Sequence, residues 1–250
     1  MNPFFRRWLP PIASPPAPKA NWALFIDLDG TLLDIAPSPD RVVIPGDLIH
    51  DLGAAFMALG GALAIVSGRQ QSEIDALLSP LRLPGGGEHG ATIRLPDGQC
   101  DEAEERVPGE WVNILTAAAS KKSGVLIERK RHSVVAHYRR APHHEDFCRK
   151  LCNNVVSGFE QDFEVLQCKM ALEIRPRTVT KARPVERLMT IDPFRGRYPI
   201  FVGDDITDED GFRAAAALSG EGLNVSARFA GKPSEVRYWL KSFARLNPAI

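Results

Sequence analysis

Two acidic residues at positions i and i+2 are the first feature of the sequence that could do chemistry. Asp27 and Asp29 directly follow a short apolar run, and Gly30 and Thr31 come next. Turns rich in Asp and Gly are common on protein surfaces. Two like charges beside the end of a buried strand, however, are tolerable where a cation neutralises them. The segment therefore predicts a pair of carboxylates that face a ligand-binding crevice.

A second acidic segment follows another apolar run farther along the chain. Asp204 and Asp205 stand at the end of that run, and Asp208, Glu209 and Asp210 come just after it. Acids favour the first turn of a helix, which explains the last two residues better than the first two. Carboxylates at two strand ends suit Mg²⁺, which binds one or two of them together with substrate phosphate oxygens. A zinc site is not expected, because the segment contains neither His nor Cys.

Two smaller features could hold a phosphate group. Ser67-Gly68-Arg69 follows a third apolar run and offers a hydroxyl and backbone N–H groups at a helix start, an arrangement that binds phosphate. A serine that only caps the helix shows the same pattern. Lys181 precedes a predicted helix, where a cation opposes the helix dipole, so its placement favours a functional role.

Parallel strands would bring these segments together. Apolar runs at 22–26, 62–66 and 199–204 are typical of strands buried on both faces, and helical periodicity separates them. This alternation predicts an α/β fold with a parallel sheet, whose ligands bind at the carboxyl ends of the strands. From about 106 to 177 the pattern changes to helices and alternating strands, which predicts an inserted α+β domain.

The predicted organisation has three parts. They are a disordered Pro-rich tail at 1–20, a core at 21–104 and 178–250, and an inserted domain at 105–177. The four cysteines show no CxxC spacing, and Cys148 and Cys152, one helical turn apart, are expected to be packed thiols and not a zinc site. No apolar run approaches a signal peptide or the roughly 18–20 residues that span a bilayer. The sequence therefore favours a soluble protein in the cytoplasm.

Composition argues against other classes of protein. The 250 residues are 44% hydrophobic and 25% charged, so the chain can bury a core and is not expected to be disordered. Thirty-one basic residues balance 31 acidic ones, which argues against non-specific binding to nucleic acid or membranes. Lys121 to Arg140 forms a local exception, with seven basic residues against Glu128, but its one stacking aromatic is Tyr138. A lining for an anionic ligand is therefore preferred to a nucleic-acid-binding module.

Taken in order, the four polar segments resemble the motifs of the haloacid dehalogenase superfamily of phosphohydrolases. The resemblance implies a HAD-like Rossmannoid core with an inserted C2-type cap domain. It further implies that Asp27 is the nucleophile, which forms an aspartyl-phosphate, and that Asp29 is the general acid and base. Ser67 and Lys181 would stabilise the phosphoryl oxygens. Asp27, the Asp29 carbonyl oxygen and Asp204 would hold Mg²⁺.

Further segments resemble the trehalose-6-phosphate phosphatase family within this superfamily. They are Gly87–Gly90, IERKRHSVVAHYR, KMALEIRP and GDDITDEDGF. The resemblance implies Mg²⁺-dependent release of phosphate from trehalose 6-phosphate, with trehalose-6-phosphate synthase as a pathway partner and no nucleic-acid or membrane partner. The candidate substrate-binding residues are Arg69, Glu88, His89, Glu128, Lys169, Glu173, Asp205 and Asp208.

Alternatives remain for the substrate and for single residues. A related phosphatase, such as one for sucrose 6-phosphate, would share the core and differ in the insert. A non-catalytic regulatory partner of a trehalose synthase would be expected to lack the acids, which are present. Glu128 and Lys130 would equally suit a solvated strand face, and His137 a structural histidine that finds its partners inside the fold.

Overall fold

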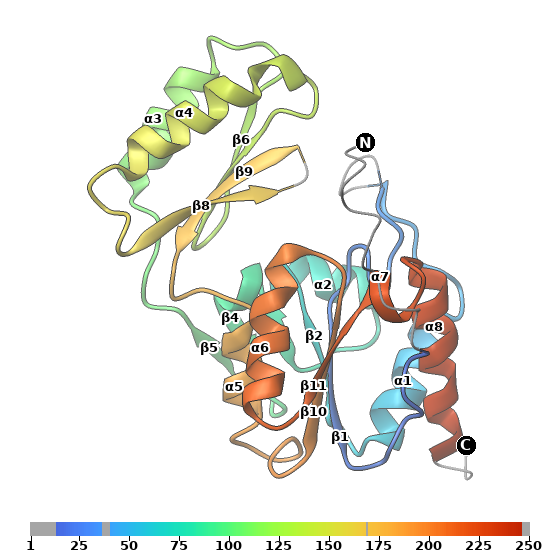
Figure 1. Ribbon diagram of the computed structural model, residues 1–250. Coiled ribbons are helices and arrows are strands. Elements are labelled where there is room, and N and C mark those ends of the chain that lie inside the picture. The colour runs from blue at the N-terminus through green and yellow to red at the C-terminus, as the bar shows by residue number, and fades with distance from the viewer. Residues whose placement is uncertain (1–13, 37–40, 169, 247–250) are drawn as a thin grey trace. The chain divides into compact units, whose positions relative to one another are not determined.

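The computed structural model describes residues 14–36, 41–168 and 170–246. The chain folds into two units (Figure 1). The first takes in the chain up to Asp101 and again from Thr180, and the second is the continuous segment Glu102–Val179. The insert expected at 105–177 lies inside the second unit. The chain therefore leaves the first unit once and returns to it once.

A seven-stranded sheet forms the centre of the first unit, in the order β11–β10–β1–β2–β3–β4–β5. Its strands are β1 (Trp22–Ile26), β2 (Leu63–Val66), β3 (Gly85–Gly87), β4 (Thr92–Arg94), β5 (Cys100–Glu102), β10 (Tyr198–Gly203) and β11 (Glu221–Asn224). The strands from β11 to β3 run parallel, and β4 is antiparallel to β3. The predicted α/β fold with a mainly parallel sheet is confirmed.

The central strand β1 is buried on both faces, as its continuous apolar sequence predicts. On one face the ring of Trp22 packs against Trp239, with centroids 6.3 Å apart. On the other face Phe25 packs against Phe194, with centroids 5.5 Å apart. Phe201 of β10 lies beside Phe25 in the parallel register. Aromatic side chains thus fix the strand whose end carries Asp27.

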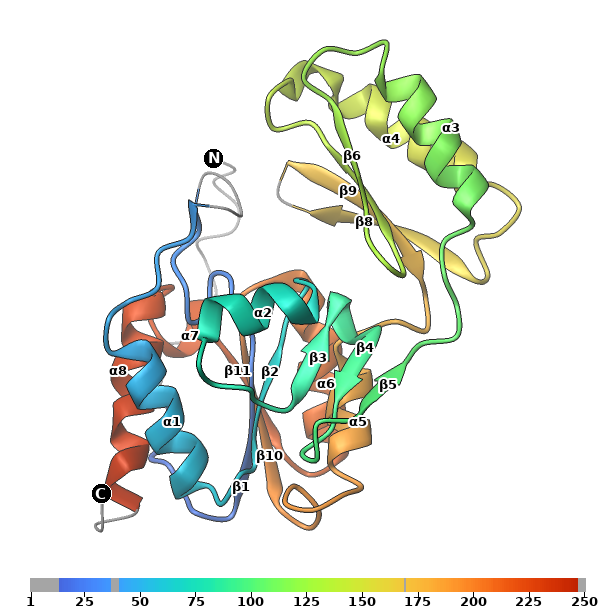
Figure 2. The same cartoon turned by 180° about the vertical axis from the view of Figure 1, so that it is seen from behind.

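Helices cover both faces of this sheet (Figures 1 and 2). Helices α1 (Leu48–Ala58) and α8 (Pro233–Lys241) lie side by side on one face, and α5 (Ala182–Leu188) and α6 (Glu209–Ala217) on the other. The other helical segments of this unit are α2 (Gln71–Leu78), α7 (Val225–Arg228) and the 3₁₀ turns η3 (Glu88–Gly90), η5 (Ile206–Asp208) and η6 (Ser242–Leu246).

The second unit is an antiparallel sheet, in the order β6–β7–β9–β8, with two helices packed on it (Figure 1). Its elements are α3 (Gly109–Ala119), β6 (Leu126–Arg129), β7 (Val134–His137), η4 (Pro142–His144), α4 (Glu145–Val156), β8 (Phe163–Cys168) and β9 (Ala171–Pro176). Cys148 and Cys152 of α4 are buried in the core of this unit and are packed thiols, as predicted. Burial raises the pKa of the Cys152 thiol to about 12.

Part of the N-terminal stretch makes hydrogen bonds with later segments of the first unit. Trp239 Nε1 donates to the carbonyl oxygen of Pro16 at 2.8 Å, and Arg197 Nη1 donates to that of Ala20 at 2.8 Å. This part of the predicted tail at 1–20 therefore differs from the expected disorder, because its carbonyls find donors on the core. Residues 1–13 of that prediction lie outside the described residues. Within the described ranges, no helix has the length and apolar character needed to cross a membrane.

Candidate active site

The carboxyl ends of three neighbouring parallel strands carry the predicted polar segments. Asp27 follows β1, Asp204 follows β10 and Ser67 follows β2. Since β1 pairs in parallel with both β10 and β2, these three residues come to the same edge of the sheet. Lys181 reaches this edge from the position just before α5. The sheet thus gathers side chains from distant parts of the sequence.

Lys181 joins two buried carboxylates. Its Nζ donates to Asp27 Oδ1 at 2.8 Å and to Asp208 Oδ1 at 2.6 Å. Burial alone would lower the pKa of Lys181, but the charges of Asp27 and Asp208 raise it, so the ammonium stays charged. Burial raises the pKa of Asp27 to about 8, and the charges of Asp208 and Asp204 contribute although Lys181 opposes them. The carboxylates of the site therefore carry more negative charge than the ammonium of Lys181 neutralises.

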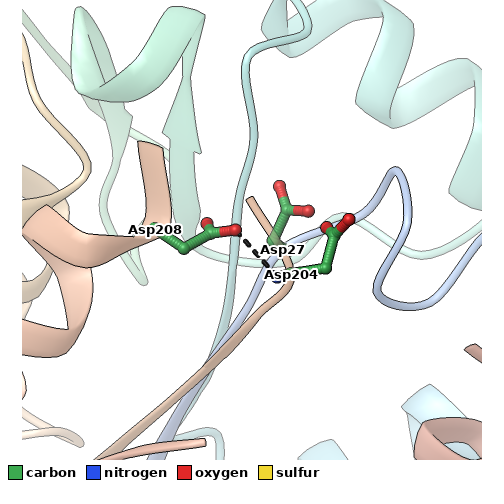
Figure 3. A group of neighbouring side chains, drawn as sticks. All are labelled: Asp27, Asp204 and Asp208. Atoms are coloured by element: carbon green, nitrogen blue, oxygen red, sulfur yellow. Dashed lines mark hydrogen bonds between the residues drawn. The ribbon is translucent and has the colours of Figure 1, made fainter. Parts of the chain in front are cut away.

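Asp208 is fully buried and its oxygens already have donors. Oδ1 accepts the bond from Lys181. Oδ2 accepts from the backbone N–H of Asp204 at 3.0 Å (Figure 3) and from that of Asp205 at 2.9 Å. Asp205 is exposed, and its Oδ1 accepts from the N–H of Ile206, which caps η5. The sequence led us to expect substrate contacts for Asp205 and Asp208. In the structure both carboxylates shape the turn after β10 that presents Asp204.

The turn that carries Asp204 packs closely against the turn that contains Gly30 and Thr31. The hydroxyl of Thr31 donates to Asp204 Oδ1 at 3.1 Å, a contact that sequence reasoning did not assign. Gly30 has φ +90°, and a Cβ there would lie 2.2 Å from Asp204 Oδ2, so a glycine is needed. Burial raises the pKa of Asp204 to about 6, and the charges of Asp208 and Asp205 add to the effect.

Three carboxylates form a set of oxygen ligands for a cation. One oxygen from each of Asp27, Asp204 and Asp208 lies within 4.8 Å of the others (Figure 3). Burial is the main cause of the raised pKa values of Asp27 and Asp204, and the charges of neighbouring carboxylates add to it. Because Asp208 already accepts bonds from three donors, Asp27 and Asp204 are the better placed of the three to bind a metal ion. The donor set thus fits a hard divalent cation.

The carboxylate of Asp29 points to Arg69. Arg69 Nε donates to Asp29 Oδ2 at 2.6 Å and Nη2 donates to Oδ1 at 2.7 Å. The hydrogen bonding to Asp29 is the main cause that raises the pKa of Arg69. The resemblance assigned the Asp29 carbonyl oxygen to the metal and its carboxyl group to proton transfer, and these roles remain predictions. The sequence suggested that Arg69 helps hold the phosphate, whereas its guanidinium is here engaged by Asp29.

The loop of Glu88 and His89 packs against the loop of Ser67. The N–H of His89 donates to the Ser67 carbonyl oxygen at 2.9 Å, and the N–H of Glu88 donates to the Arg69 carbonyl oxygen at 2.8 Å. Glu88 and His89 both have left-handed backbone, with φ 47° and 57°. A Cβ at Gly68 would lie 2.6 Å from the His89 ring, so the two loops touch closely. Such strained backbone persists only where the surroundings enforce it.

The candidate residues of the second unit share one face of its sheet. The strand register places Glu128 opposite Val135, and Val135 opposite Glu173. Side chains directly opposite one another project from the same face. Lys169, the remaining candidate there, lies outside the described residues.

Both glutamates have partners within this unit. Glu173 is buried, and its Oε1 accepts from the Ser133 hydroxyl at 2.5 Å and from Lys130 Nζ at 3.3 Å. Glu128 Oε2 lies 2.7 Å from His137 Nε2, and this hydrogen bond lowers the pKa of Glu128. Hydrogen bonds and ion pairs among these side chains therefore hold the charged groups on this face of the sheet in place.

A mainly parallel α/β core, acids after two adjacent strands and an α+β insert define a HAD-like phosphatase fold. Within this class the chain belongs to the trehalose-phosphatase family, which it matches over residues 25–242.

Known relatives agree with this placement. The chain is 41% identical to a protein of Sinorhizobium fredii named probable trehalose-phosphate phosphatase, over 82% of this chain and 78% of the relative. It is 36% identical to the trehalose-6-phosphate phosphatase of Escherichia coli, over 92% of this chain and 90% of the relative. The solved C-terminal domain of trehalose-6-phosphate phosphatase from C. albicans shares the fold, with a TM-score of 0.74 at 22% identity, and covers 90% of this chain and 92% of that chain.

Proposed function

We propose that this protein hydrolyses trehalose 6-phosphate to trehalose and phosphate. The observation that carries the proposal is the buried Asp27–Lys181 pair beside Asp204, at the ends of parallel strands. It combines a carboxylate nucleophile with fixed positive charge, as phosphoryl transfer requires. Membership in the trehalose-phosphatase family and the names of the two bacterial relatives support this choice of substrate.

Asp27 acts as the nucleophile in this proposal. Its carboxylate oxygen attacks phosphorus, the bond between phosphorus and the sugar oxygen breaks, and Asp29 gives a proton to the departing oxygen. Water then attacks the aspartyl-phosphate, Asp29 takes a proton from that water, and phosphate leaves as Asp27 is restored. Lys181, whose Nζ lies 2.8 Å from Asp27, and the hydroxyl of Ser67 stabilise the phosphoryl oxygens throughout.

Mg²⁺ is the cation that we propose for the acidic cluster. Asp27, Asp204 and the carbonyl oxygen of Asp29 would hold it, because it prefers hard oxygen ligands. When bound, it supplies positive charge to the phosphoryl oxygens and favours the ionised form of its carboxylate ligands. The close approach of the Asp27, Asp204 and Asp208 carboxylates, with one oxygen of each within 4.8 Å of the others, supports this assignment.

The second unit is proposed to be a cap domain that recognises the sugar. Glu128, Lys130 and Glu173 lie among fixed polar groups on its sheet, and such groups suit the hydroxyls of a disaccharide. Lys169 is retained as a candidate from the sequence. The presence of every acid that the reaction needs favours an enzyme over a non-catalytic regulatory partner.

Phosphate release from a panel of sugar phosphates tests the function. Trehalose 6-phosphate, sucrose 6-phosphate and glucose 6-phosphate are compared with Mg²⁺ and with EDTA. We expect trehalose 6-phosphate to be the best substrate by a wide margin and EDTA to abolish turnover. A clear preference for sucrose 6-phosphate would instead identify the related sugar phosphatase.

Asp27→Asn tests the nucleophile against a matched control. It removes the attacking oxygen with little change in size, so turnover should vanish. Asp97→Asn makes the same change at an exposed turn and should keep full activity. Full turnover by Asp27→Asn would make the assignment of the nucleophile wrong.

A further inference from the structure

The pair between Arg69 and Asp29 has the geometry of a positioning contact. Two parallel N–H···O bonds of 2.6 Å and 2.7 Å fix the plane of the Asp29 carboxylate as well as its distance. The Arg69 side chain is only 12% exposed, whereas that of Asp29 is 36% exposed. The arginine is thus the anchored partner, and Asp29 is the one open to a ligand.

The backbone around Arg69 is itself held in place. Its N–H donates to the Ser67 hydroxyl at 3.2 Å, and its carbonyl oxygen accepts from the N–H of Glu88 at 2.8 Å. A Cβ at Gly87 would lie 3.1 Å from that same carbonyl oxygen, so the two loops are in close contact. The strained, buried turn at Glu88 and His89 therefore helps to fix the backbone of Arg69, from which the guanidinium extends to Asp29.

The Asp29 carboxylate does not belong to the set of acids that could share a cation. That set comprises Asp27, Asp204 and Asp208 among the described residues. Asp29 lies two positions from Asp27 on the same turn, yet its oxygens are turned to Arg69. The arginine thus keeps this carboxylate separate from the cluster.

We propose that Arg69 is a positioning residue for Asp29. Its two N–H···O bonds hold the ionised carboxylate, and when one Asp29 oxygen carries the proton that goes to the departing sugar oxygen, the bond to the other oxygen keeps the side chain oriented. This inference rests on the proposed function, in which Asp29 supplies that proton as the bond between phosphorus and the sugar oxygen breaks. Arg69 acts through Asp29 and does not bind the phosphate itself. Lysine cannot replace it, because an ammonium lacks the planar fork that grips both carboxylate oxygens.

Two substrates with the same phosphate and different leaving groups separate the possible roles. A sugar alkoxide is a poor leaving group and needs a proton, whereas 4-nitrophenolate leaves as a stable anion without one. The kinetic constant kcat/KM covers only the steps up to departure of the leaving group, so the later attack of water does not enter it. A contact with phosphate would affect both substrates alike.

The test measures kcat/KM of Arg69→Lys and Arg69→Ala on trehalose 6-phosphate and on 4-nitrophenyl phosphate. We expect a loss of about 100-fold on the sugar phosphate, the lower end of what general acid catalysis contributes, and a loss of less than about threefold on the nitrophenyl ester. In the Asp29→Asn background the same substitution should cost less than about twofold on the sugar phosphate, because its effect passes through Asp29.

Arg94 provides a matched control. It forms the same two-point pair with Asp75, at 2.7 Å and 2.6 Å, and its side chain is 11% exposed. Arg94→Ala should lower the unfolding temperature without changing the ratio of the two kcat/KM values. This control separates loss of a buried ion pair from loss of proton transfer.

Other outcomes overturn the proposal. Equal losses on both esters, together with weaker inhibition by inorganic phosphate, would make Arg69 a phosphate ligand. Increased activity of Arg69→Ala on the sugar phosphate would make the pair an inhibitory contact. If the unaltered protein cleaves 4-nitrophenyl phosphate but not trehalose 6-phosphate, the proposed function fails by itself. The comparison then uses the best sugar phosphate of the panel and still decides the role of Arg69.

Discussion

Replacing Asp204 with asparagine is expected to stabilise the protein when no divalent cation is present. Burial, and after it the charge of Asp208, raises the pKa of Asp204 to about 6, although Thr31 donates a hydrogen bond to its carboxylate. Asparagine keeps an oxygen that can accept the bond from Thr31 and removes the charge. The folded state therefore loses a repulsive group and keeps its packing.

The pKa of Asp204 gives the size of the effect. A rise from 3.8 to about 6 corresponds to about 3 kcal/mol above pH 6, since each pH unit is worth about 1.4 kcal/mol. The side chain is partly exposed, and screening by solvent reduces this to about 1–2 kcal/mol. Because folding raises this pKa, the unaltered protein loses stability as the pH increases from about 4 through about 6. The advantage of Asp204→Asn is therefore near zero at pH 4 and complete above pH 7.

The same substitution four residues later should have the opposite sign. Asp208 accepts bonds from Lys181 and from two backbone N–H groups while fully buried. Asp208→Asn places an amide beside the Lys181 ammonium and removes one of its two carboxylate partners. Breaking a buried ion pair costs about 3–5 kcal/mol, and we expect about 3 kcal/mol because Asp27 still contacts Lys181.

Urea unfolding of the three proteins in EDTA at pH 4.5 and pH 7.5 measures these differences. Adding Mg²⁺ should then reverse the order of the unaltered protein and Asp204→Asn. Ligand at about 100 times its dissociation constant stabilises by about 2.7 kcal/mol, and only the protein with the carboxylate should gain this fully. Asp204→Asn unfolding at lower urea than the unaltered protein, in EDTA at pH 7.5, would refute the reasoning.

Two further predictions concern packing and thiol chemistry. Gly203→Ala places a Cβ 2.3 Å from the Asp208 side chain, which its hydrogen bonds hold in place. We therefore expect the free energy of unfolding, measured in urea, to fall by about 1–3 kcal/mol. An unchanged midpoint would contradict the fixed position of Asp208. Iodoacetamide should label exposed Cys100 quickly and buried Cys152, whose pKa is raised to about 12, only in urea; fast labelling of Cys152 in the native protein, read by peptide mass spectrometry, would contradict its burial.

The sequence predicts the elements that have a clear apolar pattern. The run WALFI predicts β1 with the bounds Trp22–Ile26 that the structure has, because a strand buried on both faces is apolar at every position. β3 consists of three glycines, and β11 reads EGLN. Neither strand has a side-chain pattern to recognise, so both escaped prediction. Their positions follow from pairing with β2 and β10, which is a tertiary effect.

The sequence predicts which types of residue form the site better than it predicts which groups their side chains contact. The placement of Lys181 before a helix suggested a function, but only the fold shows that its Nζ contacts two carboxylates. Spacing likewise grouped Asp208 with the ligand-binding acids, whereas its side chain points inward to backbone amides. The partner of Arg69 is 40 positions away in sequence and could not be read from its own motif. Contacts between distant loops decide these directions.

The pairing of β1 with β10 affects how the chain can fold while it is being synthesised. Thr31 and Asp204 make a hydrogen bond although 173 positions separate them. At the usual translation rate of about 5–20 residues per second, one edge of β1 stays without its partner for roughly 10–35 s. The segment Glu102–Val179 pairs its own four strands and can fold during that interval. During this time the nascent chain exposes the unpaired edge of an apolar strand to chaperones or to other chains. Asp204 joins Asp27 at the carboxyl ends of the strands only after the insert has left the ribosome.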